Sequence, residues 1–229
     1  MEYGLAEARK LLLYLNEQGI GVATEFLDPI TPPYLSDLIS WTAIGARTTE
    51  SQTHRNMASG LSMPVGFKNS TLGDLDIAVN AILSAGIGHA FLGVDHNGRV
   101  SKVTTLGNSN CHLVLRGGFN GANYSPAQIA AAQKALLSKG LLENVLVDCS
   151  HGNSQKDFRK QPAVFLDVLM QSRKNHGIIG LMIESNINEG QQRPPGDGRY
   201  RTDLEYGVSI TDGCIGFGEA RGLLRAASA

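Results

Sequence analysis

"NVLVDCSHGNSQ", residues 144–155, passes from an apolar, β-branched run directly into a cluster of polar side chains. The run Val145–Val147 is typical of a buried strand. Asp148, Ser150, His151 and Asn153 follow it almost without a break. Because buried polar groups are nearly always hydrogen-bonded, a strand that ends in so many of them predicts a site that they face. A junction of this kind, from an apolar strand to a polar or charged residue, marks a candidate site residue.

The junction recurs at five other apolar runs, each of which ends in an ionisable residue. The six runs are VATEF with Glu25, WTAIGAR ending at Arg47, PVGFK at Lys68, CHLVLR at Arg116, NVLVDCSH at His151 and GIIGLMIE at Glu184. Helical periodicity predicts helices over 5–18, 74–85, 125–138, 154–173 and near 217–227. Ser125 and Pro126 suit the N-cap and the first turn of the third of these. Apolar strands that alternate with helices predict a parallel α/β sheet.

We expect one domain over 1–229 with no linker, a length that an α/β barrel commonly reaches as one unit. The interval between Lys68 and Arg116 is longer than the later intervals between strands. Asn97-Gly98 separates two β-rich runs inside that interval, which predicts an inserted hairpin near 90–106. Residues 189–207 are rich in Pro, Gly and charge, which predicts a long exposed loop able to act as a lid.

Composition excludes several classes of protein. A net charge of −1 without a basic block argues against nucleic acid as the partner. The three cysteines, Cys111, Cys149 and Cys214, are too few and uneven for a disulfide framework and favour reduced thiols. No apolar run approaches the roughly 18 residues of a membrane span, and the first twenty residues are not signal-like. We therefore expect a soluble, cytoplasmic protein.

The six strand-end residues should meet at one edge of the sheet, where parallel α/β proteins bind their ligands. Taken singly, an arginine there is more often a surface ion pair, and a histidine more often a satisfied hydrogen-bonding group. Six such residues in sequence favour one pocket. Arg47, Lys68 and Arg116 would give it a cationic wall suited to a phosphate and a carboxylate.

Three further groups suggest a metal. His151, Glu184 and Asp212 offer one nitrogen and two oxygens, a set that suits Mn, Fe, Co or Zn. Such an ion would polarise a carbonyl of a small phosphorylated acid. Asp212 could instead cap the final helix, a role that Ser209 or Thr211 could share. Cys149 is a candidate fourth ligand, although a small buried hydrophobe is the commoner role for such a residue.

Several longer stretches resemble one enzyme family. They are EFLDPITPPY, AIGARTTESQTHR, PVGFKN, LVLRGG, SHGNSQKDFRKQ, GLMIESNINEGQQ and YGVSITDGCIGF. They resemble the class I 3-deoxy-D-arabino-heptulosonate 7-phosphate (DAHP) synthases of the fungal and bacterial type. The resemblance implies a (β/α)8 TIM barrel that condenses phosphoenolpyruvate with erythrose 4-phosphate, the first committed step of the shikimate pathway to aromatic amino acids. It also implies residue roles: phosphoenolpyruvate binding by Arg47, Ala46, Lys68 and Arg116, metal binding by His151, Glu184 and Asp212, and a place near the reacting phosphoenolpyruvate for Glu25.

The sequence departs from that family in ways that carry expectations. It begins on the helix before the family's third barrel strand, which predicts an incomplete barrel with about six of eight strands. A metal-binding cysteine, one arginine and a Lys-Pro-Arg stretch are not found. Val94-Asp95 and Pro33 stand where the family has Thr-Lys and Gln. We expect a homo-oligomer, or a complex with a full-length paralogue, that covers the gap, unless the segment 1–19 folds into it.

These departures leave three functions open. The first is a DAHP synthase-like enzyme, for which we expect a weak or empty metal site and little turnover by this chain alone. Phosphoenolpyruvate, pyruvate or phosphate should bind more weakly than in a full-length relative, and erythrose 4-phosphate poorly. The second is a descendant with another use, either a different reaction in a specialised pathway or a pseudoenzyme partner. The third is a fragment without function.

Overall fold

The computed structural model describes residues 2–95, 97–194 and 204–228. It divides into two compact units. The N-terminal unit comprises Met1–Val114 with Ser138–Leu142, and the C-terminal unit comprises Leu115–Leu137 with Glu143–Ala229. The single domain expected over 1–229 stays a prediction.

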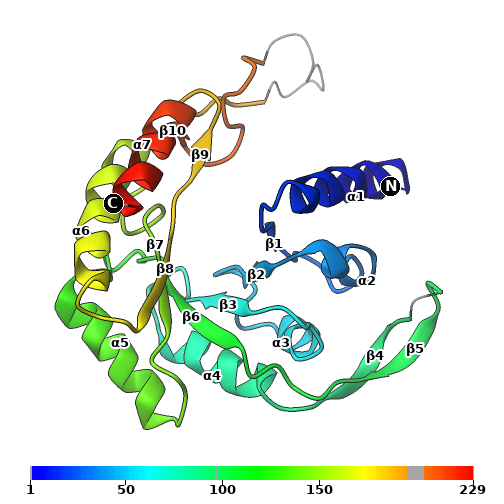
Figure 1. Ribbon diagram of the computed structural model, residues 1–229. Helices are drawn as coiled ribbons and strands as arrows, with labels where there is room; N and C mark the ends of the chain where they lie inside the picture. Colours follow the sequence, from blue (N-terminus) through cyan, green and yellow to red (C-terminus); the bar gives the residue numbers. More distant parts are fainter. Residues whose placement is uncertain (1, 96, 195–203, 229) are drawn as a thin grey trace. The chain divides into compact units, whose positions relative to one another are not determined.

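Six strands form one sheet in the order β1-β2-β3-β6-β7-β8, which confirms the predicted α/β class (Figure 1). They are β1 (Ala23–Glu25), β2 (Trp41–Ile44), β3 (Val65–Lys68), β6 (Cys111–Leu115), β7 (Val145–Asp148) and β8 (Ile178–Met182). The described registers between neighbours are parallel. Each of the six predicted strands is therefore present, and each ends at or just before its predicted ionisable residue.

The predicted hairpin is also confirmed. β4 (Ala90–Val94) and β5 (Val100–Thr104) pair antiparallel and form a sheet of their own. Gly98 has a φ of 73° in the turn, and its N–H donates to Asp95 O at 2.9 Å. A left-handed backbone at that position explains why the Asn-Gly pair was an informative signal.

The described residues of the N-terminal unit form five helices. They are α1 (Glu2–Glu17), α2 (Pro32–Leu35), the 3-10 helix η1 (Ser36–Leu38), α3 (Gln52–Ala58) and α4 (Asp76–Ala85). α4 packs on β3 and α3 through an alanine-rich face that includes the fully buried Ala78 and Ala81. α1 contacts α2 and η1, where the Arg9 guanidinium donates to both carboxylate oxygens of Asp37 at 2.7 and 2.8 Å.

A tryptophan–histidine pair, in which the histidine is buried and the tryptophan partly so, lies across β3. Trp41 at the start of β2 donates its Nε1–H to Nε2 of His112 near the start of β6, at 3.0 Å. A Cβ at Gly66, on the strand between them, would lie 2.5 Å from Trp41 Cζ2 and 3.2 Å from His112 Nε2. Glycine at this position therefore leaves the room in which the two side chains meet. Nε2 of His112 accepts the Trp41 hydrogen bond, and burial lowers the pKa of the ring.

The described residues of the C-terminal unit form the helices α5 (Pro126–Ser138), the 3-10 helix η2 (Phe158–Lys160), α6 (Gln161–Ser172) and α7 (Phe217–Ala227). In this unit, α6 packs on β8, and α7 packs on α6, β9 (Ser185–Asn186) and β10 (Ile215–Gly216). The predicted N-cap of α5 is confirmed, because Ser125 Oγ accepts from Gln128 N at 3.4 Å and Gln128 Oε1 accepts from Ser125 N at 3.2 Å. This reciprocal pairing is a capping box with glutamine.

Two expectations for this unit were wrong. The helix predicted over 154–173 begins only at Gln161, because Gln155 and Lys156 have φ values of 57° and 60°, outside the helical region. The alternative role of Asp212 as a helix cap is also wrong, along with that of Ser209 or Thr211. α7 begins at Phe217, and its N-cap is Gly216.

The segment before α7 contains structure that the sequence analysis missed. β9 (Ser185–Asn186) and β10 (Ile215–Gly216) pair in parallel. Gly190 and Cys214 form an antiparallel bridge with two hydrogen bonds, of 2.9 and 3.0 Å. Of the lid predicted over 189–207, residues 195–203 lie outside the described residues, and the lid stays a prediction.

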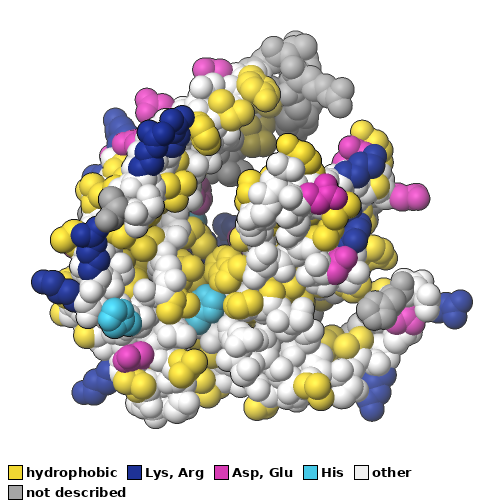
Figure 2. Space-filling view, viewed as in Figure 1, with side chains coloured by type: hydrophobic (Ala, Val, Ile, Leu, Met, Phe, Trp, Pro, Cys, Tyr) yellow, Lys and Arg dark blue, Asp and Glu magenta, His cyan; other side chains and the backbone are white. Residues whose placement is uncertain are grey.

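The surface carries no strong signature of a charged partner on the face in Figure 2. Acidic, basic and apolar side chains are interspersed there among the described residues, in line with the net charge of −1. None of the helices in the described ranges is both long and apolar enough to cross a bilayer.

Candidate functional site

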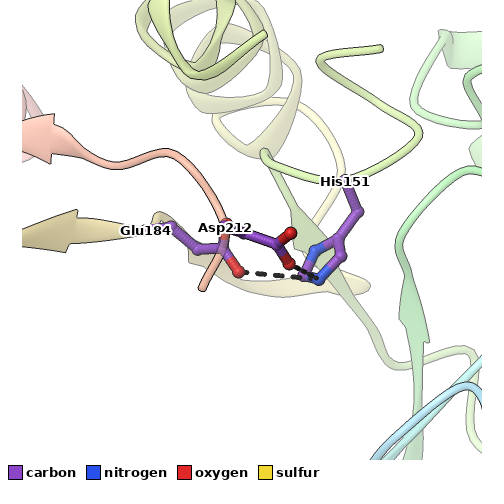
Figure 3. Close-up of side chains that lie close together, drawn as sticks. All are labelled: His151, Glu184 and Asp212. Atoms are coloured by element: carbon purple, nitrogen blue, oxygen red, sulfur yellow. Dashed lines mark ion pairs between the residues drawn. The ribbon is translucent and has the colours of Figure 1, made fainter. Parts of the chain in front are cut away.

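Three predicted ligands meet in the C-terminal unit (Figure 3). His151 Nε2 lies 3.5 Å from Glu184 Oε1 and 3.6 Å from Asp212 Oδ2. One ligand atom from each residue lies within 4.8 Å of the other two. Ligand atoms about 2.0–2.2 Å from a shared ion lie at most about 4.4 Å apart, and the two histidine–carboxylate distances of 3.5 and 3.6 Å meet that limit. The cluster therefore has the dimensions of a metal site.

Backbone pairing brings the three residues together from separate segments. β7 and β8 pair with Asp148 opposite Met182, and Cys149 N donates to Met182 O at 2.8 Å. His151 and Glu184 thus follow adjacent strand ends. Ile215 N donates to Glu184 O at 3.0 Å, which holds the segment after Asp212 beside Glu184.

The loop that carries His151 has an unusual backbone. His151 itself has a φ of 50°, a left-handed conformation that L-residues adopt at a cost in free energy. A Cβ at Gly152 would lie 2.3 Å from Gly118 N, so glycine permits a close approach of two backbones. Gly152 N also donates to Arg116 O at 3.0 Å. The loop after β7 is therefore tied directly to the residue that ends the β6 segment.

The Asn153 side chain adds further hydrogen bonds between this loop and the segment around Arg116. Its buried amide nitrogen donates to Leu115 O at 3.1 Å and to Asp148 O at 2.8 Å. Its Oδ1 accepts from Asn123 N at 2.8 Å. One side chain thus links the ends of β6 and β7 with the loop that follows Arg116.

An acidic environment surrounds the His151 ring. The fully buried Asp148 places Oδ2 2.9 Å from His151 Nδ1. Among the described residues, that buried nitrogen has no hydrogen-bond partner of suitable geometry. With Glu184 and Asp212 on the other side of the ring, three carboxylates lie around one imidazole. A divalent cation would offset the repulsion among them.

Glu184 is held from its side chain as well. Ser150 Oγ donates to Glu184 Oε2 at 2.7 Å. Burial raises the pKa of Glu184, and the hydrogen bond from Ser150 opposes that rise. The carboxylate is therefore partly desolvated and oriented, as a ligand to a cation should be.

Cys149 does not join the cluster. Its side chain is fully buried, and burial raises the pKa of its thiol to about 12. A thiol that stays protonated is a poor metal ligand. Burial thus favours the interpretation of Cys149 as a packed hydrophobe.

The other predicted residues are distributed between the two units. In the N-terminal unit, a Cβ at Gly45 would lie 1.9 Å from Glu25 Oε1, so the Glu25 carboxylate lies over the turn that carries Ala46 and Arg47. Thr49 Oγ1 lies 2.9 Å from Gly45 O and 2.8 Å from Lys68 O, which joins that turn to the end of β3.

Lys68 is buried, whereas Arg47 is exposed. Arg116, which is also buried, lies in the C-terminal unit with the metal-type cluster. One pocket shared by all six strand-end residues stays a prediction.

Sequence reasoning missed the residues that support the cluster. Asp148, Ser150 and Asn153 stood in the polar run that opened the sequence analysis, but nothing in that run shows which of them contacts which ligand. Gln161, whose side chain contacts the Glu184 backbone, carried no signal beyond its place before a proline near a helix start.

Comparison with known families now adds a second line of support. Residues 4–224 match the DAHP synthetase I family. The chain belongs to that family. The resemblance inferred from short motifs is thereby confirmed over nearly the whole sequence.

Two relatives from Escherichia coli are named phospho-2-dehydro-3-deoxyheptonate aldolases. This DAHP synthetase I chain is 54% identical over 226 residues to the Tyr-sensitive phospho-2-dehydro-3-deoxyheptonate aldolase of Escherichia coli (strain K12), covering 98% of this chain and 62% of that one. It is 50% identical over 223 residues to the Phe-sensitive enzyme of the same organism, covering 97% and 62%. The chain therefore spans a little under two thirds of the length of these relatives.

A solved structure agrees with the fold. The phospho-2-dehydro-3-deoxyheptonate aldolase from Francisella tularensis SCHU S4 superimposes with a TM-score of 0.92 at 45% sequence identity. The match covers 99% of this chain and 65% of that chain. The strand order of the DAHP synthetase I chain is thus that of a barrel-derived α/β enzyme fold.

Proposed function

We propose that this chain acts in the DAHP synthase reaction, the aldol-type condensation of phosphoenolpyruvate with erythrose 4-phosphate. The observation that carries the proposal is the cluster of His151, Glu184 and Asp212, within 4.8 Å of one another, in a chain of the DAHP synthetase I family. The names of the two Escherichia coli relatives support the same reaction.

The cluster fits a divalent cation of the Mn, Fe, Co or Zn group, held by one imidazole nitrogen and two carboxylates. When bound, the ion would supply Lewis-acid polarisation of a carbonyl oxygen. His151 would offer Nε2, because Nε2 faces Glu184 and Asp212 whereas Nδ1 faces Asp148. Ser150 would keep the Glu184 carboxylate turned toward the cluster.

Substrate binding is proposed for the cationic strand-end residues. Arg47, Lys68 and Arg116, with the neighbouring Ala46, are proposed to bind the phosphate and carboxylate of phosphoenolpyruvate. Glu25 is proposed to lie near the reacting part of that molecule. The burial of Lys68 and Arg116 supports the proposal, because a buried cation binds an anion with less screening than an exposed one.

We also propose a compartment and an assembly state for the protein. Cys111, Cys149 and Cys214 are free thiols, which supports a reducing compartment such as the cytoplasm. β1 and β8 are the first and last strands of the described sheet, and such edge strands support assembly into a homo-oligomer or with a longer paralogue.

The experiment is a two-substrate assay. Purified chain is given a divalent metal, phosphoenolpyruvate and erythrose 4-phosphate, and the loss of phosphoenolpyruvate absorbance is followed. We expect a slow loss that requires erythrose 4-phosphate and metal and that disappears in His151→Ala. A loss that ignores erythrose 4-phosphate, or that survives in His151→Ala, would contradict the proposal. Calorimetry of phosphoenolpyruvate with Arg116→Ala, Lys68→Ala and Arg47→Ala tests the anion-binding residues one at a time.

A further inference from the structure

Gln161 makes an unusual pair of contacts with the backbone of a proposed metal ligand. It is the first residue of α6, and its side chain is fully buried. Its Oε1 accepts from Glu184 N at 2.7 Å, and its Nε2 donates to Glu184 O at 3.1 Å. The side-chain amide thus pairs with both polar groups of the Glu184 residue, much as a neighbouring strand would.

This pairing occurs where the sheet no longer supports the chain. β8 ends at Met182, so Glu184 lies beyond the described ladder with β7. A half-buried peptide without partners would cost free energy, and Gln161 satisfies both of its polar groups. Glu184 O also accepts from Ile215 N at 3.0 Å. The Glu184 residue is therefore held on one side by the start of α6 and on the other by β10.

We propose that Gln161 is a positioning residue that fixes Glu184 for cation binding. It acts through the Glu184 main chain and does not touch the cation. Loss of the amide frees the segment around Glu184, so that the ordering of this ligand has to occur when the ion binds. Outer-sphere partners of metal ligands typically contribute about 10- to 100-fold in metal affinity. The inference rests on the metal part of the proposed function.

The C-terminal unit contains a matched control. Gln133 of α5 is also a buried glutamine with a fully engaged amide. Its Nε2 donates to Glu143 O at 3.2 Å and to Asn175 Oδ1 at 3.0 Å, and its Oε1 accepts from Asn175 Nδ2 at 2.9 Å. None of these partners is a proposed ligand. Loss of either amide removes buried hydrogen bonds, but only loss of the Gln161 amide releases Glu184.

The test compares Gln161→Met with Gln133→Met in the 229-residue chain. Methionine keeps the length and apolar stem of glutamine and removes both hydrogen-bonding groups. Binding of Mn²⁺ is titrated by the electron paramagnetic resonance signal of the free ion, and thermal unfolding is followed in parallel. We expect both variants to unfold at lower temperature than the parent. Gln161→Met should bind Mn²⁺ at least about tenfold more weakly, whereas Gln133→Met should bind as the parent does.

A second variant keeps the test decisive if Gln161→Met does not fold. Gln161→Asn keeps the amide but shortens the side chain by one methylene, so it reaches the Glu184 main chain less well and should weaken Mn²⁺ binding by a smaller factor. Parental Mn²⁺ affinity in a folded Gln161 variant overturns the positioning role and leaves the metal site intact. Equal weakening by Gln133→Met also overturns it. A parent chain that binds no Mn²⁺ overturns the metal part of the proposed function, and the positioning role with it.

Discussion

Two histidines at opposite ends of their strands show how differently one residue type is used. His112, near the start of β6, is almost fully buried, accepts from Trp41 Nε1–H and lies 3.3 Å from Asn110 O through Nδ1. His151, after the end of β7, meets three carboxylates instead. The neutral partners of His112 satisfy both ring nitrogens within the protein. The acidic partners of His151 leave a concentration of negative charge that a cation would balance.

The difference lies in the partners rather than in burial alone. A neutral histidine has one donor and one acceptor nitrogen. When one nitrogen meets an acceptor and the other a donor, both are satisfied and the side chain contributes to packing. A histidine that faces several carboxylates has more acceptors than protons to share. The start of β6 thus contributes to packing, and the proposed cation site follows the end of β7, as expected for the two ends of barrel strands.

The largest expected effect is a loss of Mn²⁺ affinity on substitution of His151 that substitution of His112 does not cause. His151→Ala deletes a proposed ligand and should weaken Mn²⁺ binding by more than the roughly 10- to 100-fold typical of an outer-sphere residue. His112→Ala should leave Mn²⁺ binding unchanged and lower stability, because Trp41 Nε1–H loses its buried acceptor. Metal titration and urea denaturation of both variants provide the measurement. A reversal of the two outcomes would break the comparison.

A second substitution probes the space in which His112 meets Trp41. Gly66→Ala adds a Cβ 2.5 Å from Trp41 Cζ2 and 2.7 Å from Val114 Cγ2. Overpacking of this kind typically destabilises a protein by about 1–3 kcal/mol. Gly222→Ala in α7 is the control, since its Cβ would meet no atom within 4 Å and alanine favours a helix by about 1 kcal/mol. We expect opposite signs in urea denaturation, and equal signs would count against the steric argument.

A third substitution tests the charge behind His151. Asp148→Asn keeps the shape of the side chain and an oxygen to accept from Ser150 N, a bond of 2.9 Å in the parent. It removes the negative charge 2.9 Å from His151 Nδ1, which should lower Mn²⁺ affinity by about tenfold. The affinity is compared with that of Asp157→Asn, whose carboxylate pairs with Arg159 and not with the cluster. An unchanged affinity in Asp148→Asn would show that this charge does not support the ligand.

The smallest effect concerns pH and His112. Burial lowers the pKa of this ring below its ordinary value of 6.5, so the unfolded chain takes up a proton before the folded chain does. The resulting stability is complete above pH 6.5 and is lost as the pH falls through the lowered pKa of the folded state. The free energy of unfolding from about pH 8 to about pH 5 should fall more steeply for the parent than for His112→Gln. Parallel curves would contradict the assignment.

The main elements of the fold could be predicted because their sequence signals are continuous. Each of the six strands is an apolar run, and the hairpin is marked by Asn97-Gly98. The start of α6 could not be predicted, since Gln155 and Lys156 adopt left-handed conformations without being glycines. β9 and β10 span two residues each, too few for any periodicity to appear.

The candidate site also contains residues that the sequence predicts and residues that it does not. His151, Glu184 and Asp212 could be proposed from their chemistry and their places after strands. The contacts that orient them could not, because Gln161 and Glu184 are 23 residues apart in the chain. Nothing local to Gln161 indicates that its amide pairs with a distant backbone. The ligands thus carry a sequence signal, and their supports depend on the tertiary structure.

The left-handed backbone of the His151 loop has a consequence for protein engineering. In the described ranges, the non-glycine residues with positive φ are His151, Gln155 and Lys156, all in this one loop. Each such residue typically costs about 1 kcal/mol or more. Glycine at the exposed positions 155 and 156 would relieve that cost and also loosen the loop. Selection for thermostability and selection for metal affinity should therefore favour different residues here, and variants from the two selections should diverge first in this loop.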